Sequence, residues 1–73
     1  MSFGSNLRYY RIQKKLTLKD LSDDLKVSIN YLSKLEQNKA KIYPDFLPKL
    51  CAVLHIEIVD LYQENLPDLT KEQ

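Results

Sequence analysis

The stretch LTLKDLSDDLKVSINYLSKLE, residues 16–36, carries the strongest structural signal in the chain. Thr17 is a good helix N-cap, and Asp20, three positions later, completes an acidic capping box. Leucines follow at the spacing of one helix face. The pattern breaks at residues 26–27, and Ser28 then provides a second capping residue. The stretch therefore predicts two short helices joined by a tight turn.

The second of these helices is polar over most of its surface. Leu32 and Leu35 form a narrow apolar stripe that packs the two helices together, with Leu21 on the first helix. A helix, a three- to four-residue turn and a helix make a helix-turn-helix, whose second helix can enter the DNA major groove. Asn30 suits adenine and Lys34 suits guanine. The alternative is an ordinary amphipathic helix with a solvated face, and patterning alone does not separate the two.

The remaining segments also favour helices. One glycine, three prolines and a single β-rich run, IEIV, leave little sign of strands. Apolar residues at helical spacing predict a first helix over about 3–15 and a third that ends near Asn38. Asp45 is expected to cap a fourth helix, and a fifth covers about 57–62. We therefore predict an all-α fold of five short helices.

The whole chain, residues 1–73, is expected to form one domain, since it is too short for two. Its core covers about 3–63, the helix-turn-helix about 17–37, and a polar tail 64–73. The apolar content of 44% and charged content of 29% fit a folded domain. No apolar run approaches a membrane span, and the start lacks the apolar centre of a signal peptide. We expect a cytoplasmic protein that does not enter a membrane.

Catalytic and metal-binding patterns are not evident. The single Cys51 lies in the apolar run LPKLCAVL, which favours a buried thiol over a disulfide or a zinc site. The single His55 lies at a predicted helix end, the carboxylates are scattered, and no glycine-rich phosphate loop occurs. We expect no enzyme, no cofactor, no metal ligand and no small-molecule substrate.

Charge is divided unevenly along the chain. The net charge is only +1, but residues 1–43 carry +5 and residues 44–73 carry −4. Such a division suggests a basic face toward a polyanion and an acidic end facing away, although charged runs often only solvate a surface.

Three blocks resemble the Cro and lambda-type phage repressor family, also called the xenobiotic-response-element family of helix-turn-helix regulators. FGSNLRYYRIQKKLTLKDLS resembles its opening, LTLKDLSDDLKVSINYLSKLEQNK its central motif, and PDFLPKLCAVLHIEIVDLY its last two helices. The blocks follow in order over about residues 3–62. The resemblance implies a compact five-helix lambda-repressor-like domain and a sequence-specific regulator of transcription, in particular a repressor, that binds double-stranded DNA.

The resemblance also assigns site residues. Arg11 and Glu36 would form an ion pair that fixes the recognition helix against the first helix. The residues facing the bases would be Ile29, Asn30, Ser33 and Lys34. Those contacting the DNA backbone would be Thr17, Lys19, Ser28, Tyr31, Asn38, Lys39 and Lys41. For Tyr31 the alternative is partial burial against the second helix.

Three positions depart from the family pattern. Leu18 stands where the family often has a Gln that braces a phosphate and the recognition helix, so that contact is expected to be missing. Lys26 stands where a turn glycine is usual, and a left-handed Lys costs on the order of 1 kcal/mol. Ser22 fits a close helix crossing, but its hydroxyl needs a partner.

Association is expected because one recognition helix reads only a few base pairs. A homodimer would read a palindromic operator. Its interface is predicted from the apolar residues of the last helix and tail, which are Ile58, Val59, Tyr62, Leu66 and Leu69. The alternative function is an antitoxin or protein-interaction module of the same fold, with a protein partner such as a toxin or anti-repressor.

Overall fold

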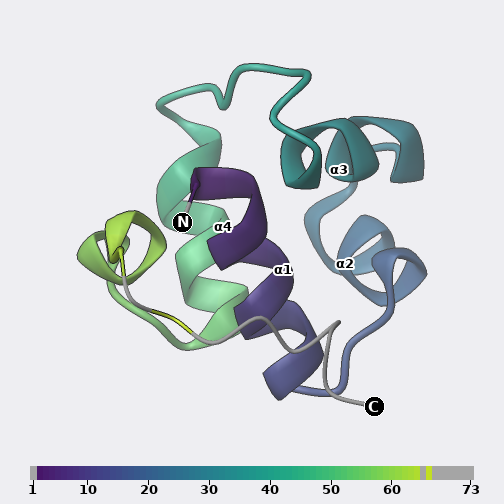
Figure 1. Cartoon of the computed structure of the whole chain (residues 1–73). Helices are drawn as coiled ribbons and strands as arrows, with labels where there is room; N and C mark the ends of the chain where they lie inside the picture. Colours follow the sequence, from purple (N-terminus) through teal and green to yellow (C-terminus); the bar gives the residue numbers. More distant parts are fainter. Residues whose placement is uncertain (1, 65, 67–73) are drawn as a thin grey trace, which may run out of the picture.

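The computed structural model describes residues 2–64 and residue 66, and within them it contains four α-helices and one short 3-10 helix (Figure 1). The elements are α1 (Phe3–Gln13), α2 (Leu18–Leu25), α3 (Ile29–Glu36), α4 (Phe46–Leu54) and η1 (Ile58–Tyr62). No strand occurs in this part of the chain. The all-α prediction is confirmed, and the fifth predicted helix is the 3-10 element.

The first helix lies at the centre of the molecule (Figure 1). It packs against α3 on one side and η1 on the other, while α4 contacts both α2 and η1. Seven of the nine core residues are leucines, whose side chains fill the space between these elements. The core residues are Leu7, Leu21, Leu32, Leu35, Phe46, Leu50, Cys51, Leu54 and Leu61. Each buried leucine contributes roughly 1.5–3 kcal/mol, so this core holds all five elements together.

A left-handed residue other than glycine follows each of the four α-helices. These residues are Lys15, Lys26, Asn38 and His55, with φ between 57° and 61°. After each one, the next amide bonds the carbonyl five residues back, at 2.8–3.3 Å, as in a Schellman motif. A left-handed non-glycine residue costs about 1–2 kcal/mol, and asparagine tolerates it best.

Two helix boundaries and one cap differ from the sequence prediction. Helix α1 ends at Gln13 and α3 at Glu36, two residues earlier than predicted, because the left-handed turn begins there. Asp45 precedes α4 but makes no capping hydrogen bond, since its backbone is already helical, with φ −70° and ψ −24°. The carbonyl of Tyr43 accepts from the first α4 amides instead, at 2.9 and 3.2 Å. Prediction of Asp45 as the cap was therefore wrong.

Two buried residues of α1 fix its neighbours. A Cβ on Gly4 would lie 2.4 Å from the carbonyl oxygen of Glu36 and 2.6 Å from that of Leu35, so α3 approaches α1 too closely for any side chain. The amide of Asn6 donates to the carbonyls of Leu61, at 2.9 Å, and Gln63, at 2.6 Å. These contacts set where α3 and the end of η1 lie against α1.

Candidate nucleic-acid interface

The second helix begins where the sequence predicts. The hydroxyl of Thr17 accepts from the Asp20 amide at 3.0 Å, and the Asp20 carboxylate accepts from the Thr17 amide at 2.8 Å. The bond from the Thr17 amide favours the ionised carboxylate and holds the pKa of Asp20 below its ordinary value. The N-terminal end of α2, which carries a positive partial charge, is exposed to solvent at Thr17, Lys19 and Asp20.

The turn between the two helices is held by local contacts. Lys26 adopts the left-handed conformation, with φ 58°. The Ser22 hydroxyl donates to the Val27 carbonyl at 2.5 Å, which gives this hydroxyl the partner it needs. Ser28 then caps α3 by accepting from the Tyr31 amide at 3.0 Å. These local contacts therefore set where α2 ends and where α3 begins.

A nearly buried ion pair anchors the end of α3 to α1. Nε of Arg11 lies 2.6 Å from one carboxylate oxygen of Glu36 and Nη2 lies 3.2 Å from the other. The two side chains are only 11% and 4% exposed. Arg11 also donates to the Leu16 carbonyl at 2.9 Å, and the more exposed Arg8 lies 3.7 Å from the same carboxylate. This bidentate geometry fixes the direction of α3.

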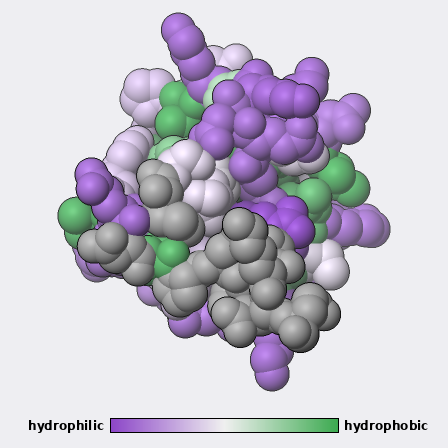
Figure 2. Space-filling view, viewed as in Figure 1, coloured by the Kyte–Doolittle hydropathy of each residue, from purple (hydrophilic) through white to green (hydrophobic). Residues whose placement is uncertain are grey.

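The opposite side of α3 is open to solvent. Ile29 is 43% exposed, and Asn30 and Lys34 are also exposed. Ser33 is half-buried and its hydroxyl accepts from the Gln37 amide at 2.9 Å. Figure 2 shows mostly hydrophilic side chains over the upper right of the molecule, where α3 lies. The structure thus brings the four predicted base-facing residues onto one short helix, with Ser33 the least accessible.

Predicted backbone contacts flank this helix on the α2 side. Thr17, Lys19 and Ser28 are exposed. Lys19 pairs with Asp23 at 3.2 Å, but both side chains are largely exposed, at 72% and 64%. A surface pair of this kind is worth about 0–1 kcal/mol, so Lys19 can leave it for a phosphate at small cost.

The loop after α3 carries two further exposed lysines, Lys39 and Lys41. It is tied to α3 at both ends, by the Lys39 amide on the Lys34 carbonyl at 2.8 Å and by the Tyr31 hydroxyl on the Lys41 carbonyl at 2.9 Å. Burial raises the pKa of Tyr31. Since its proton points to a carbonyl, Tyr31 would have to release Lys41 to donate to a phosphate. Its ring is half-buried beside Tyr43 and Phe46.

Asn38 has a structural role that sequence reasoning missed. Its side-chain oxygen accepts from the Gly4 amide at 3.0 Å, and its nitrogen donates to the Ser2 hydroxyl at 2.9 Å. The side chain therefore caps α1 rather than standing free for DNA. The exposed Tyr43, stacked on Tyr31 with ring centroids 5.8 Å apart, was also missed. The one sequence signal for this close contact between α1 and the end of α3 was Gly4.

Other site types find no counterpart in residues 2–64 and 66. No three His, Cys, Asp or Glu side chains in this range are grouped as metal ligands would be. Within the same range, no helix combines the length and apolar content that a bilayer crossing demands. Cys51 is buried in the core, and burial raises the pKa of its thiol.

Comparison with known proteins agrees with this geometry. Residues 4–67 match the family model described as a helix-turn-helix domain. The chain is similar to the clp gene regulator ClgR from Corynebacterium glutamicum, with 32% identity and a TM-score of 0.78, over 82% of this chain and 64% of that one. It thus spans less than two thirds of that ClgR chain. No curated protein sequence matches.

Two SinR structures are also similar. The N-terminal DNA-binding domain of SinR from Bacillus subtilis is 30% identical, with a TM-score of 0.77, over 89% of this chain and 96% of that one. SinR, the master regulator for biofilm formation, solved in complex with DNA, is 31% identical, with a TM-score of 0.76, over 84% and 98%. The chain belongs to the helix-turn-helix family of the xenobiotic-response-element type.

Proposed function

We propose that this chain is a sequence-specific regulator of transcription, acting as a repressor, that reads the major groove of double-stranded DNA with α3. The observation that carries the proposal is the two-sided α3. Its back is fixed by the Arg11–Glu36 pair, while Asn30 and Lys34 extend from its front. A helix that is rigidly oriented and polar on its free face suits groove reading. The DNA-binding SinR domain, of similar fold, supports the same role.

In the proposed complex, each group of residues does a different job. Asn30 makes a bidentate contact with adenine, Lys34 reaches guanine, and Ile29 touches a thymine methyl group. Ser33 contributes where its half-buried hydroxyl can turn outward. The phosphate contacts come from residues on both flanks of α3, namely Thr17, Lys19, Ser28, Lys39 and Lys41. Such contacts position the protein and make affinity fall with salt.

Two of the predicted backbone contacts carry less of this proposal. The side chain of Asn38 is occupied by Gly4 and Ser2, and the hydroxyl of Tyr31 by Lys41. Asn38 and Tyr31 therefore act mainly by holding the loop, so that the ammonium groups of Lys39 and Lys41 stay near the phosphates.

A homodimer on a palindromic operator completes the proposal. Two recognition helices would read half-sites about 34 Å apart. Ile58, Val59 and Tyr62 on η1 are 45%, 66% and 54% exposed and offer an apolar surface for a second copy. Leu66 is half-buried, and Leu69 lies outside the described residues. Figure 2 shows hydrophobic side chains at the left of the molecule, where η1 lies.

The same exposed η1 residues favour the second candidate function, a protein-interaction module or antitoxin. That function would depend on the apolar residues of η1 and not on Asn30 or Lys34. Sedimentation of the free chain and of the chain with DNA separates self-association from binding to another protein.

Binding to fragments of the chain's own genome, including DNA upstream of its gene, tests the proposal. Measurements at two salt concentrations should find one palindromic fragment bound tightly and in a salt-sensitive manner. Asn30→Ala and Lys34→Ala should each weaken that complex by about 1–3 kcal/mol and leave nonspecific binding nearly unchanged, because they remove base contacts. Lys49→Ala, an exposed lysine of α4, is the matched control. Weak binding that is uniform across the fragments and unchanged by both substitutions would rule out base reading.

A further inference from the structure

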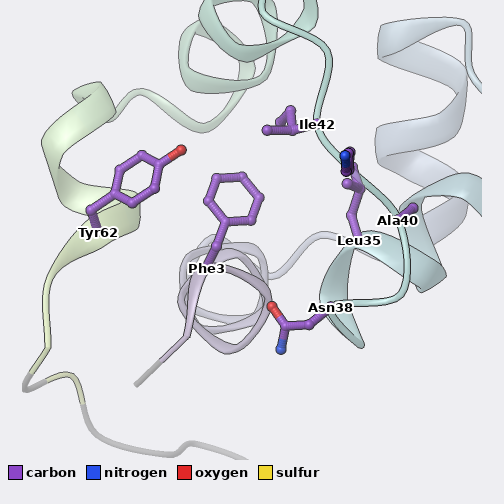
Figure 3. Close-up of a pocket in the computed structure, with 7 residues that line it drawn as sticks. Phe3, Leu35, Asn38, Ala40, Ile42 and Tyr62 are labelled. Carbon is purple, nitrogen blue, oxygen red and sulfur yellow. The ribbon is translucent and has the colours of Figure 1, made fainter.

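An open pocket lies between the start of α1, the loop after α3 and η1 (Figure 3). Its volume is about 380 Å³, enough for a large apolar side chain. Phe3 lies between Tyr62 and Ile42 in the close-up, and the Phe3 and Tyr62 rings are 5.4 Å apart. The other residues that line the pocket are Leu35, Asn38, Ala40 and Lys41. Most of the lining residues are apolar, with the polar Asn38 and Lys41 among them, and they come from α1, α3, the loop after α3 and η1.

The apolar surface continues out of the pocket onto η1. Tyr62 lines the pocket and is 54% exposed, and it shares this short helix with the exposed Ile58 and Val59. Single exposed apolar residues are ordinary, but a contiguous set beside a concavity is typical of an interaction site. A protein segment can cover such a surface more fully than a small molecule can.

The charge of the pocket lining is positive. Lys41 is the one charged residue in the lining, and Lys39 belongs to the same loop. A bound segment therefore meets a cation at the loop side of the pocket.

We infer that this pocket docks a segment of another protein that carries a leucine or phenylalanine anchor next to acidic residues. The anchor would lie between Phe3, Ile42 and Tyr62, where a single buried side chain can supply most of the binding energy. The acidic residues would lie over Lys41, since opposite charge gives orientation and speeds association.

Occupancy of this pocket is coupled to the DNA-facing loop, and this part of the inference rests on the proposed function. Lys41 lines the pocket and is also a proposed phosphate contact. Its carbonyl is bonded to Tyr31 on α3. A carboxylate on Lys41 would compete with a phosphate for the same ammonium group. The docked segment would therefore weaken DNA binding, as an anti-repressor does.

A random linear peptide library displayed on phage, selected on the full chain without DNA, tests the pocket. The enriched peptides should carry an apolar anchor flanked by Asp or Glu. A synthetic peptide of the enriched sequence should shift the NMR signals of Phe3, Ile42 and Tyr62. Its affinity should fall about fivefold in Lys41→Glu and about tenfold in Tyr62→Ala, and it should remain unchanged in the control Lys49→Glu.

Thermal unfolding shows whether each variant is folded. If Tyr62→Ala does not fold, the affinity of Lys41→Glu for the peptide decides the test. Enriched peptides that are basic, that shift signals elsewhere or that bind Lys41→Glu equally well would overturn the inference. Signals of Phe3 and Ile42 that shift with protein concentration alone would also overturn it, because a second copy then fills the pocket and does not only cover the exposed face of η1.

Operator competition separates the two proposals. The peptide should raise the apparent Kd for operator DNA, and an unchanged Kd would overturn the coupling. If the peptide binds the pocket but the chain binds no operator, the inference about the pocket stands and the proposed function is wrong. If the chain binds an operator but selects no acidic peptide, the proposed function stands and the inference about the pocket is wrong.

Discussion

The two helices of the helix-turn-helix are held in different ways. Helix α2 is defined by contacts within its own stretch, namely the Thr17–Asp20 box and the Ser22–Val27 bond. Helix α3 is positioned by α1, which lies 25 or more residues earlier in the chain, through the Arg11–Glu36 pair and the close approach of Gly4. Local contacts therefore decide where a helix starts and stops, and distant contacts decide where it points. The variants below test this difference.

The largest effect is expected from Glu36→Gln, which removes the charge between two guanidinium groups. Arg11 would stay nearly buried without its anion, so the free energy of unfolding should fall by about 3 kcal/mol. Urea unfolding measures this loss. The control Arg8→Ala removes a half-exposed group 3.7 Å from the same carboxylate and should cost less than about 1 kcal/mol. Equal losses in the two variants would show that Arg11 does not anchor α3.

Gly4→Ala should have the next largest effect. The added methyl group would collide with two carbonyl oxygens of α3, so α3 must shift, at a cost of about 1–3 kcal/mol. Unfolding experiments should show this loss, and NMR shifts should spread to Leu35 and Glu36. Gln13→Ala, at an exposed position of the same helix, should leave stability within about 0.5 kcal/mol. A stable Gly4→Ala with unshifted α3 signals would contradict the close approach.

Lys26→Gly should raise stability by about 0.5–1 kcal/mol. Glycine adopts the left-handed conformation without strain, although it loses more entropy on folding than lysine does. The matched control is Lys19→Gly within α2, which should lower stability by about 1 kcal/mol. Thermal unfolding compares the two. A loss at both positions would mean that the left-handed turn is not strained.

The smallest effect is a pH dependence of the α2 capping box. The pKa of Asp20 is lower in the folded chain than in the unfolded chain because the Thr17 amide donates to the carboxylate. The stability it contributes is present above the unfolded pKa and is lost as pH falls through the folded pKa. Asp20→Asn removes the titration, so the stability difference between the two proteins should shrink on acidification. If the difference in stability between the two proteins stays constant as the pH falls through the folded pKa of Asp20, the Asp20 carboxylate does not stabilise the capping box.

The same contrast explains what could be predicted from sequence. The start of α2 and the Ser28 cap depend on residues within a few positions, and both were predicted from those residues. The left-handed Lys26 was expected from the glycine that the family usually has there, and the structure confirms it. The anchoring roles of Gly4 and Asn38 depend on a contact 34 residues apart, which no local pattern specifies. The Arg11–Glu36 assignment came from family resemblance and not from spacing.

The site shows the same limit. Exposure of Asn30 and Lys34 follows from helical periodicity, since both lie away from Leu32 and Leu35. The engagement of the Tyr31 hydroxyl with the loop carbonyl does not, because it depends on how the loop folds back. Asp45 failed as a cap for a related reason, since the turn at Tyr43 already satisfies the first amides of α4.

The left-handed residues after α1, α2 and α4 also bear on how long this chain lasts in a cell. Lys15, Lys26 and His55 each retain strain that glycine would remove, so together they keep stability about 1.5–3 kcal/mol below what the fold could reach. Proteases act on the unfolded form, whose population rises about tenfold for each 1.4 kcal/mol of stability that is lost. We therefore expect these three turns to shorten the lifetime of each copy. A regulator with a shorter lifetime follows changes in its own synthesis more quickly.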